Sequence, residues 1–156
     1  MPKALIKNYS LRAVLSAVLL VAFIVGFIST PHMGVATFSY GVLLIGLTFR
    51  KVDRKLHGQL MLSGVFLDLS LVLILEAQRS AINTAMEFSL TLPQQAHIAF
   101  SLLAVLMYIP AVIIGVGRYR GKITSPATRK AHKLIGLTAM TFRSLGFILM
   151  FTLLDK

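Results

Sequence analysis

The sequence contains no cysteine and is short of charge, since only 13% of its 156 residues are Asp, Glu, Lys or Arg. The absence of cysteine excludes disulfides, thiolate metal sites and thiol chemistry. A water-soluble domain has about 25% charged residues. The low charge, a hydrophobic content of 56% and a mean hydropathy of +0.82 together indicate that a bilayer surrounds most of the chain.

Acidic residues are the scarcest charged type, with five Asp and Glu against 16 Lys and Arg. These carboxylates are too few and too scattered to form an acid–base pair. The sequence also has no glycine-rich phosphate loop, serine nucleophile elbow or His-Glu-x-x-His motif. No hydrolytic or phosphoryl-transfer site is therefore predicted. The net charge of +11 does not indicate a nucleic-acid partner, because the basic residues lie in short clusters between apolar runs.

Five apolar runs predict five transmembrane helices, since one span needs about 20 predominantly apolar residues. We expect a single all-α domain over 1–156, an integral membrane bundle whose helices two to five form an antiparallel four-helix core. The first run follows a basic N-terminus and precedes no small-x-small cleavage site, so it is expected to stay as an anchor. The predicted spans are about 11–29, 32–49, 56–77, 96–117 and 131–154.

The segments between the predicted spans differ in charge, and this sets the expected orientation. A polar stretch over 78–95, expected to be partly a short interfacial helix, contains only one cation, whereas the loop over 118–133 is strongly basic. The N-terminus and the segment after the second span are basic as well. The positive-inside rule then places the N-terminus in the cytoplasm and the C-terminus outside. Pro110 is expected to kink the fourth span or to mark a packing site.

The four histidines each lie at the beginning of one of the last four predicted spans. Because neighbouring helices are expected to be antiparallel, His57 and His132 fall at the cytoplasmic end, and His32 and His97 at the opposite end. With about 1.5 Å of rise per residue, the two pairs are too far apart for one metal site. Imidazole is an axial ligand of haem iron, and helix bundles supply such ligands from facing helices. The pattern predicts one or two bis-histidine haems, against the alternative of four solvated interfacial histidines.

A second group of polar residues shares these stripes. Asp68 follows His57 by 11 residues, Arg143 follows His132 by 11, and Tyr108 follows His97 by 11. This spacing is about three helical turns, so all three lie near mid-membrane, where ionisable groups usually pair within the bundle. We expect an Asp68–Arg143 ion pair with Tyr108 as a hydrogen-bond donor, serving to lock the bundle, to contact a haem propionate or to relay protons.

Two further sets of residues are candidates for the same cofactor. Met61 lies one helical turn after His57 and is a possible iron or copper ligand, although core packing is the ordinary role of methionine. Copper is accordingly the less favoured metal. The basic loop offers further propionate contacts, besides its role in setting topology, through Arg118, Arg120, Lys122, Arg129 and Lys130.

Three short motifs are similar to those of a known group of proteins: Leu56-His57-Gly58-Gln59-Leu60-Met61-Leu62, Ala96-His97-Ile98 and Arg129-Lys130-Ala131-His132-Lys133-Leu134. They resemble a small bacterial membrane-protein family of four to five helices, formerly of unknown function, which includes a maturation factor for a haem-copper oxidase. The ascorbate-reducible transmembrane cytochrome b family is a weaker, architectural resemblance, since it also pairs histidines from alternate helices at each membrane face. These resemblances imply a multi-pass protein of the bacterial inner membrane.

The sequence thus predicts a haem b-binding membrane protein that takes part in electron transfer, with a quinone or a cytochrome as its partner. If it is redox-active, it is a membrane cytochrome rather than a hydrolase or transferase. A non-redox assembly factor that contacts respiratory oxidase subunits is the first alternative. An accessory structural subunit of a larger membrane complex is the second.

Overall fold

The computed structural model describes residues 3–79 and 90–151, apart from the side chains of 3–10, 12, 78 and 79. This part of the chain contains five long helices, one short 3-10 helix and no strand, which confirms the predicted all-α class. The elements are α1 (Lys3–Ile28), α2 (Pro31–Thr48), η1 (Phe49–Lys51), α3 (Arg54–Arg79), α5 (Leu92–Tyr119) and α6 (Pro126–Phe151). Most of the stretch 78–95, including the interfacial helix expected there, lies outside the described residues.

Three helices begin earlier than predicted because polar residues cap them. The side chain of Asp53 accepts from the N–H of Leu56 at 3.0 Å, so α3 begins at Arg54. Thr91 donates its N–H to Gln94 Oε1 at 2.9 Å in a capping box at the start of α5. Ser125 Oγ accepts from Ala127 N at 3.3 Å at the start of α6. Caps of this kind satisfy N–H groups that have no partner within the helix. The histidines of α5 and α6 consequently lie more than one turn inside their helices.

The basic segment over 118–133 is mostly helical, so its prediction as a loop was wrong. α5 extends to Tyr119, and α6 already begins at Pro126. Between them, Gly121 adopts a φ of +69°, a left-handed conformation that glycine takes without strain and that commonly ends helices. α5 also continues through Pro110.

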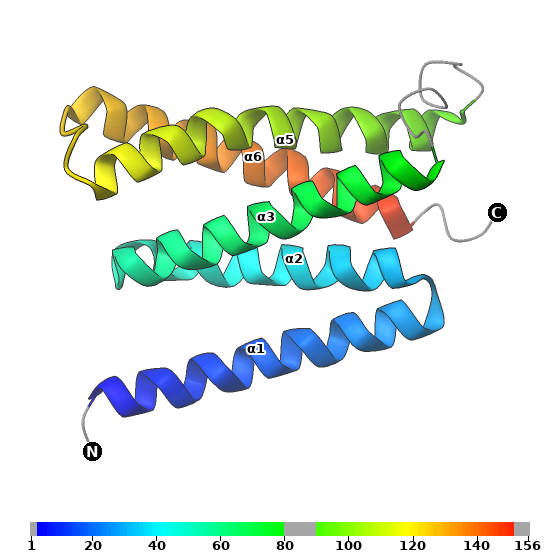
Figure 1. Cartoon of the computed structure of the whole chain (residues 1–156), viewed down its shortest axis with the longest axis horizontal. Helices are drawn as coiled ribbons and strands as arrows, with labels where there is room; N and C mark the ends of the chain where they lie inside the picture. The colour runs from blue at the N-terminus through cyan, green and yellow to red at the C-terminus, as the bar shows by residue number, and fades with distance from the viewer. Residues whose placement is uncertain (1–2, 80–89, 152–156) are drawn as a thin grey trace.

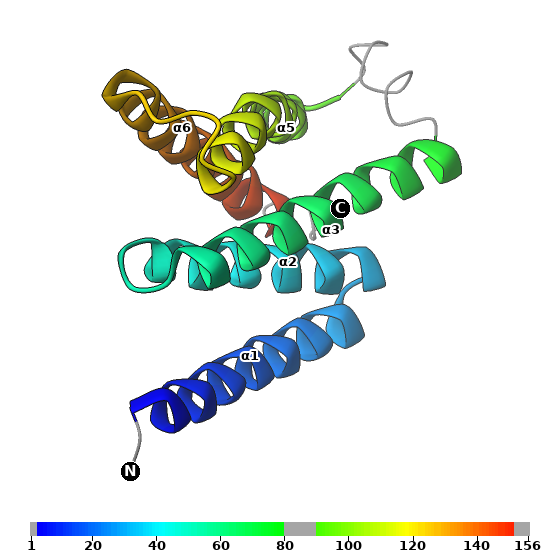
Figure 2. The same cartoon turned by 60° about the vertical axis from the view of Figure 1, so that its left-hand side comes forward.

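Consecutive long helices run in opposite directions (Figure 1). The α2–α3 turn, the α5–α6 loop and the N-terminal end of α1 lie at one end of the molecule, which we call the basic end (Figures 1 and 2). Among residues 3–79 and 90–151, every Lys and Arg except Arg79 and Arg143 belongs to the segments that meet there.

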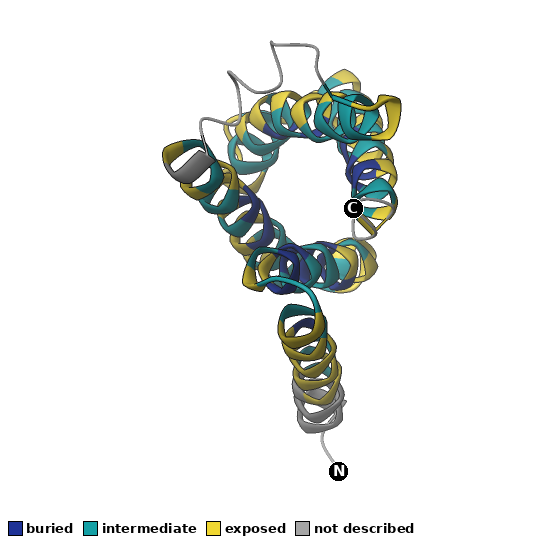
Figure 3. Ribbon diagram, turned by 90° about the vertical axis from the view of Figure 1, so that its right-hand side faces the viewer, coloured by how far each residue is buried: buried dark blue, intermediate teal, exposed yellow. Residues whose placement is uncertain are grey.

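Helices α2, α3, α5 and α6 surround a common axis, and α1 lies outside them against α2 (Figure 3). α2 packs along α3 and α5 packs along α6, whereas contacts between these two hairpins are few. The core formed at their meeting point consists of Leu43, Val65, Ala104, Tyr108, Ala139 and Met140. The fold is therefore two helical hairpins joined near their middle.

Four of the helical segments are long and apolar enough to cross a membrane: Pro31–Lys51, Arg54–Ala77, Leu92–Tyr119 and Pro126–Phe151. In the first predicted span, the described apolar stretch is the shorter Ala13–Ile28. The outward faces carry large apolar side chains, such as Phe66 with 69% and Leu134 with 68% of its surface exposed. A soluble monomer rarely exposes so much apolar surface. These features indicate a multi-pass membrane protein.

Candidate functional site

A buried ion pair joins the two hairpins. Arg143 in α6 donates from Nε to Asp68 Oδ2 at 2.7 Å and from Nη2 to Oδ1 at 2.9 Å, in a bidentate arrangement. Tyr108 in α5 donates its hydroxyl to Asp68 Oδ2 at 2.9 Å. From α2, Ser39 donates its hydroxyl to Asp68 Oδ1, and the Ala36 carbonyl accepts from Arg143 Nη2 at 3.1 Å. All four helices thus contribute to one group, which we call the central polar cluster: Ala36, Ser39, Asp68, Tyr108 and Arg143.

The buried polar side chains of the central polar cluster all have hydrogen-bond partners. Asp68 and Arg143 are 6% and 8% exposed, and every described buried side-chain nitrogen or oxygen has a hydrogen-bond partner. Removing one member of such a pair costs about 3–5 kcal/mol, because the other charge is left buried and alone. Arg143 has Nε and Nη2 engaged inside the cluster, so only Nη1 remains for the propionate contact, which stays a prediction.

A second contact between the hairpins lies beside the cluster. The Tyr40 hydroxyl of α2 is 2.8 Å from Ser144 Oγ of α6. The Tyr40 ring stacks on Phe147 with ring centroids 4.5 Å apart, and the Arg143 guanidinium carbon lies 5.6 Å from the centre of the Tyr40 ring. These contacts add aromatic and cation–π attraction to the ion pair. The two hairpins are therefore held together mainly at mid-length.

Three histidine rings contact the backbone of the helix beside them. His57 Nδ1 in α3 is 2.8 Å from the carbonyl of Gly46 in α2. His97 Nδ1 in α5 is 2.8 Å from the carbonyl of Gly146 in α6. His132 Nδ1 in α6 is 3.1 Å from the carbonyl of Ala111 in α5.

These contacts assign the tautomer of the rings. A carbonyl oxygen only accepts, so Nδ1 must carry the proton and donate it. In a neutral imidazole the lone pair is then on Nε2. Metal-binding histidines commonly have this arrangement, with one ring N–H held by a carbonyl or carboxylate and the other nitrogen on the metal. The three rings are therefore fixed in orientation, with the lone pair of each neutral ring on Nε2.

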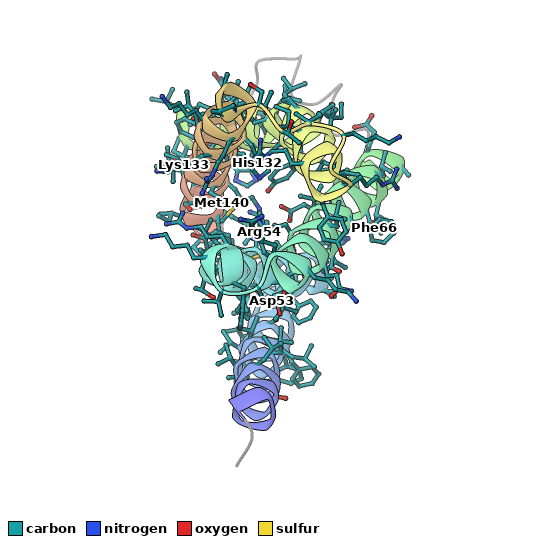
Figure 4. All side chains as sticks on the ribbon, turned by 90° about the vertical axis from the view of Figure 1, so that its left-hand side faces the viewer. Asp53, Arg54, Phe66, His132, Lys133 and Met140 are labelled. Carbon is teal, nitrogen blue, oxygen red and sulfur yellow. The ribbon has the colours of Figure 1, made fainter. Side chains whose placement is uncertain are left out.

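The structure places the members of one predicted histidine pair at the same end of the molecule. His57 lies in the first turn of α3 and His132 in the second turn of α6, both at the basic end. The His132 side chain points toward the space enclosed by the four helices (Figure 4). His97 is at the opposite end of α5, and His32 is partly buried in the first turn of α2. The pairing of His32 with His97 stays a prediction.

One glycine lies directly against the His132 ring. A Cβ on Gly115 of α5 would lie 3.0 Å from His132 Cε1, so glycine allows the ring to lie against the helix. Gly136 lies one turn after His132, and a Cβ there would meet nothing within 4 Å. The helix surface at Gly136 consequently has room for a larger group. Met61 instead packs on Gly46, since a Cβ on this glycine would lie 3.0 Å from Met61 Sδ.

The α5–α6 hairpin has one antiparallel register that serves both of its histidines. His97 precedes Ala111 in α5 by the same number of positions as His132 precedes Gly146 in α6. These four residues make the two histidine–carbonyl contacts of the hairpin. Each helix thus supplies one ring near its start and, about four turns later, one acceptor for the ring of the other helix.

The α2–α3 hairpin has one of these two histidine–carbonyl contacts. His32 precedes Gly46 in α2 by the same number of positions as His97 precedes Ala111 in α5, and Gly46 accepts from His57 of α3. The corresponding position after His57 is Leu71. The two hairpins therefore place their histidines equivalently along the helices.

Sequence reasoning missed Ser39, Tyr40 and Ser144, whose hydroxyls connect the helices. Their signal was a polar group in the middle of an apolar span. Among residues 3–79 and 90–151, no group of three or more His, Cys, Asp or Glu forms a candidate metal site. Comparison of the chain with known protein families, curated proteins and solved structures found no match.

Proposed function

We propose that this chain is a multi-pass membrane protein that binds haem b between paired histidines and takes part in electron transfer. The observation that carries the proposal is the Nδ1–H to carbonyl hydrogen bond of His57, His97 and His132. It leaves Nε2 of each ring free for iron. A bis-histidine site needs two such rings from facing helices, and His57 of α3 with His132 of α6 is the pair proposed at the basic end.

Two features near this pair support the proposal. The hairpins are joined at the central polar cluster and have few other contacts with each other. A Cβ on Gly136, one turn after His132, would meet nothing within 4 Å, and Gly115 accommodates the His132 ring. Small residues on facing helices are also used for close helix packing, but the hydrogen bond that orients the His132 ring favours a bound group.

Each part of the chain has a distinct role in this proposal. His57 and His132 bind the iron at the basic end, and His97 with His32 binds a second haem at the opposite end. When bound, haem supplies reversible one-electron chemistry. The central polar cluster fixes the angle and separation of the hairpins, so that the two rings of each pair stay opposed. Cations near the basic end are provided by Arg118, Arg120, Lys122, Arg129 and Lys130.

The register of the hairpins supports the second site. Two positions about four turns apart in a helix are separated by about 20 Å, which leaves room for one haem above the other. We further propose that helices α2, α3, α5 and α6 form an antiparallel core within the bilayer, with the basic end in the cytoplasm. The compartment proposed is the bacterial inner membrane, with a quinone, a cytochrome or a respiratory oxidase as partner.

The test is a dithionite-reduced minus oxidised optical spectrum of the detergent-purified protein. We expect a sharp b-type α-band that falls by about half in His57→Ala/His132→Ala, since one of two axial pairs is lost. The matched control is Gln59→Ala/Lys133→Ala, which changes exposed residues next to the same histidines and is expected to keep the full band.

A colourless wild-type protein, produced with ample haem, would contradict the cytochrome proposal. Co-purification of oxidase subunits with that colourless protein would then favour the assembly factor. A monodisperse colourless protein without such subunits would leave the accessory structural role. An equal loss of the band in the control would show that the basic end is merely sensitive to substitution.

A further inference from the structure

A groove of about 530 Å³ lies at the basic end of α5. It runs along one face of the last turns of this helix and is bounded by the segment that follows. Ile113 in it is 62% exposed, so the groove opens to the outside of the bundle. Its walls are apolar except for two cations, and the residues that line it include Val112, Ile113, Val116, Ile123, Arg120 and Lys122.

The turn after α5 builds one wall of this groove. The carbonyl of Gly117 accepts from the N–H of Lys122 at 2.9 Å and from that of Ile123 at 3.2 Å. The positive φ of Gly121 reverses the chain there. Ile123 then folds onto the helix, where a Cβ on Gly117 would lie 2.5 Å from its Cδ1. The sequence thus uses two glycines to place an isoleucine beside the apolar face of α5.

The cations in the groove differ from their neighbour Arg118. Arg118 donates from Nη1 to the Ser125 carbonyl at 3.0 Å and to Thr128 Oγ1 at 3.1 Å, so it holds the loop. Arg120 and Lys122 are exposed and make no side-chain hydrogen bond or ion pair with the described residues. Two unengaged cations at the end of an apolar groove match a ligand with an anionic head and an apolar tail.

We propose that this groove binds an anionic glycerophospholipid of the surrounding leaflet. The apolar face from Val112 to Arg120 is about 12 Å long, enough to hold part of an acyl chain. The phosphate lies between Arg120 and Lys122 at the level where basic side chains meet lipid headgroups. The inference rests on the membrane location in the proposed function, but not on haem.

The experiment is native mass spectrometry of the full chain in detergent with dioleoylphosphatidylglycerol, and separately with dioleoylphosphatidylcholine. We expect wild type to retain phosphatidylglycerol preferentially. Arg120→Gln/Lys122→Gln is expected to weaken retention about fivefold or more, given the typical contribution of a basic residue at an anionic surface. The matched control, Arg129→Gln/Lys130→Gln, removes the same charge from exposed residues that do not line the groove, and it should change retention less than twofold.

A third variant, Val116→Trp, fills the groove without changing charge and is also expected to lower retention. No preference of wild type for phosphatidylglycerol would overturn the proposal, as would an equal loss in the two charge variants. Retention that survives Val116→Trp would show a simple anion contact and overturn it as well. A colourless protein that still selects phosphatidylglycerol would contradict only the haem proposal, and a coloured protein that does not select would contradict only this one.

Discussion

His97 and His132 connect α5 and α6 in opposite senses. His97 of α5 donates to Gly146 of α6, and His132 of α6 donates to Ala111 of α5. The separation along the chain from each histidine to the acceptor on its own helix is the same, so one register sets both contacts. A hairpin with this arrangement presents one prepared imidazole at each end. The α2–α3 hairpin has the same geometry at His57, which donates to α2.

The equal spacing of the histidines in the two hairpins predicts that His32 and His97 form one site. We expect His32→Ala and His97→Ala each to lower the haem content by up to one haem per chain, and the double variant to lower it little more than either alone, because both substitutions weaken the axial coordination of the same iron. Haem per chain is measured by the pyridine haemochrome method, with Val35→Ala, an exposed position in the same helix, as control. Additive losses in the double variant would contradict a shared site.

The central polar cluster predicts strong coupling between Asp68 and Arg143. Asp68→Leu or Arg143→Met alone should lower the free energy of unfolding by about 3–5 kcal/mol, because each leaves a buried charge without its partner. The double variant should lose far less than the sum, since packed apolar residues can replace a buried pair. Denaturant unfolding in detergent, followed by circular dichroism, gives the four values of the cycle. Simple additivity would show that the pair is not coupled.

Removing the Tyr108 hydroxyl is expected to lower the free energy of unfolding by less than breaking the ion pair does. Tyr108→Phe keeps the ring in the core but removes the donor to Asp68 Oδ2. A hydrogen bond to a charged group contributes about 1.5–3 kcal/mol, so the unfolding free energy should fall within that range. Tyr119→Phe, at a tyrosine that is 65% exposed, is the control and should cost almost nothing. Equal effects of the two substitutions would show that the Tyr108 hydroxyl does not stabilise the central polar cluster.

Hydropathy alone predicted the helices, and residue spacing predicted that Asp68, Tyr108 and Arg143 share one depth. The helix starts were placed too late because Asp53, Thr91 and Ser125 are polar caps that a hydropathy criterion assigns to loops. The Ser39 contact was not predicted, since a serine within a helix often bonds its own backbone. The histidine–carbonyl contacts depend on how each helix is rotated about its axis, which spacing within one helix does not determine.

The equivalence of the hairpins was also hidden in the sequence. The offset from His32 to His97 is shorter than the offset from His57 to His132. No single offset aligns both pairs, because the second hairpin is longer between its two histidines. A repeat search at fixed period therefore finds nothing, while the antiparallel register of each hairpin shows the correspondence.

The distribution of basic residues predicts the topology. With the basic end in the cytoplasm, green fluorescent protein fused before Met1 should fluoresce, and alkaline phosphatase fused after Lys156 should be active on the far side. Reporters exchanged between the two ends serve as controls and should both be silent. An active phosphatase at the N-terminus would reverse the proposed orientation, and with it the assignment of His57 and His132 to the cytoplasmic half.

The close contact of α1 with α2 is expected to depend on Gly34. A Cβ at this position would lie 2.8 Å from the Ala22 carbonyl and 3.0 Å from Gly26 Cα. Backbone atoms cannot yield as a flexible side chain does, so Gly34→Leu should separate α1 from α2 while the rest of the bundle stays folded.

Crosslinking of Val18→Cys with Gly41→Cys measures this separation, because a Cβ on Gly41 would lie 3.4 Å from Val18 Cβ and the chain has no other cysteine. The crosslink should form readily in the wild-type background and be largely lost with Gly34→Leu. Gly58→Ala, where a Cβ meets nothing within 4 Å, should leave it intact, and undiminished crosslinking with Gly34→Leu would show that the α1–α2 contact does not depend on this glycine.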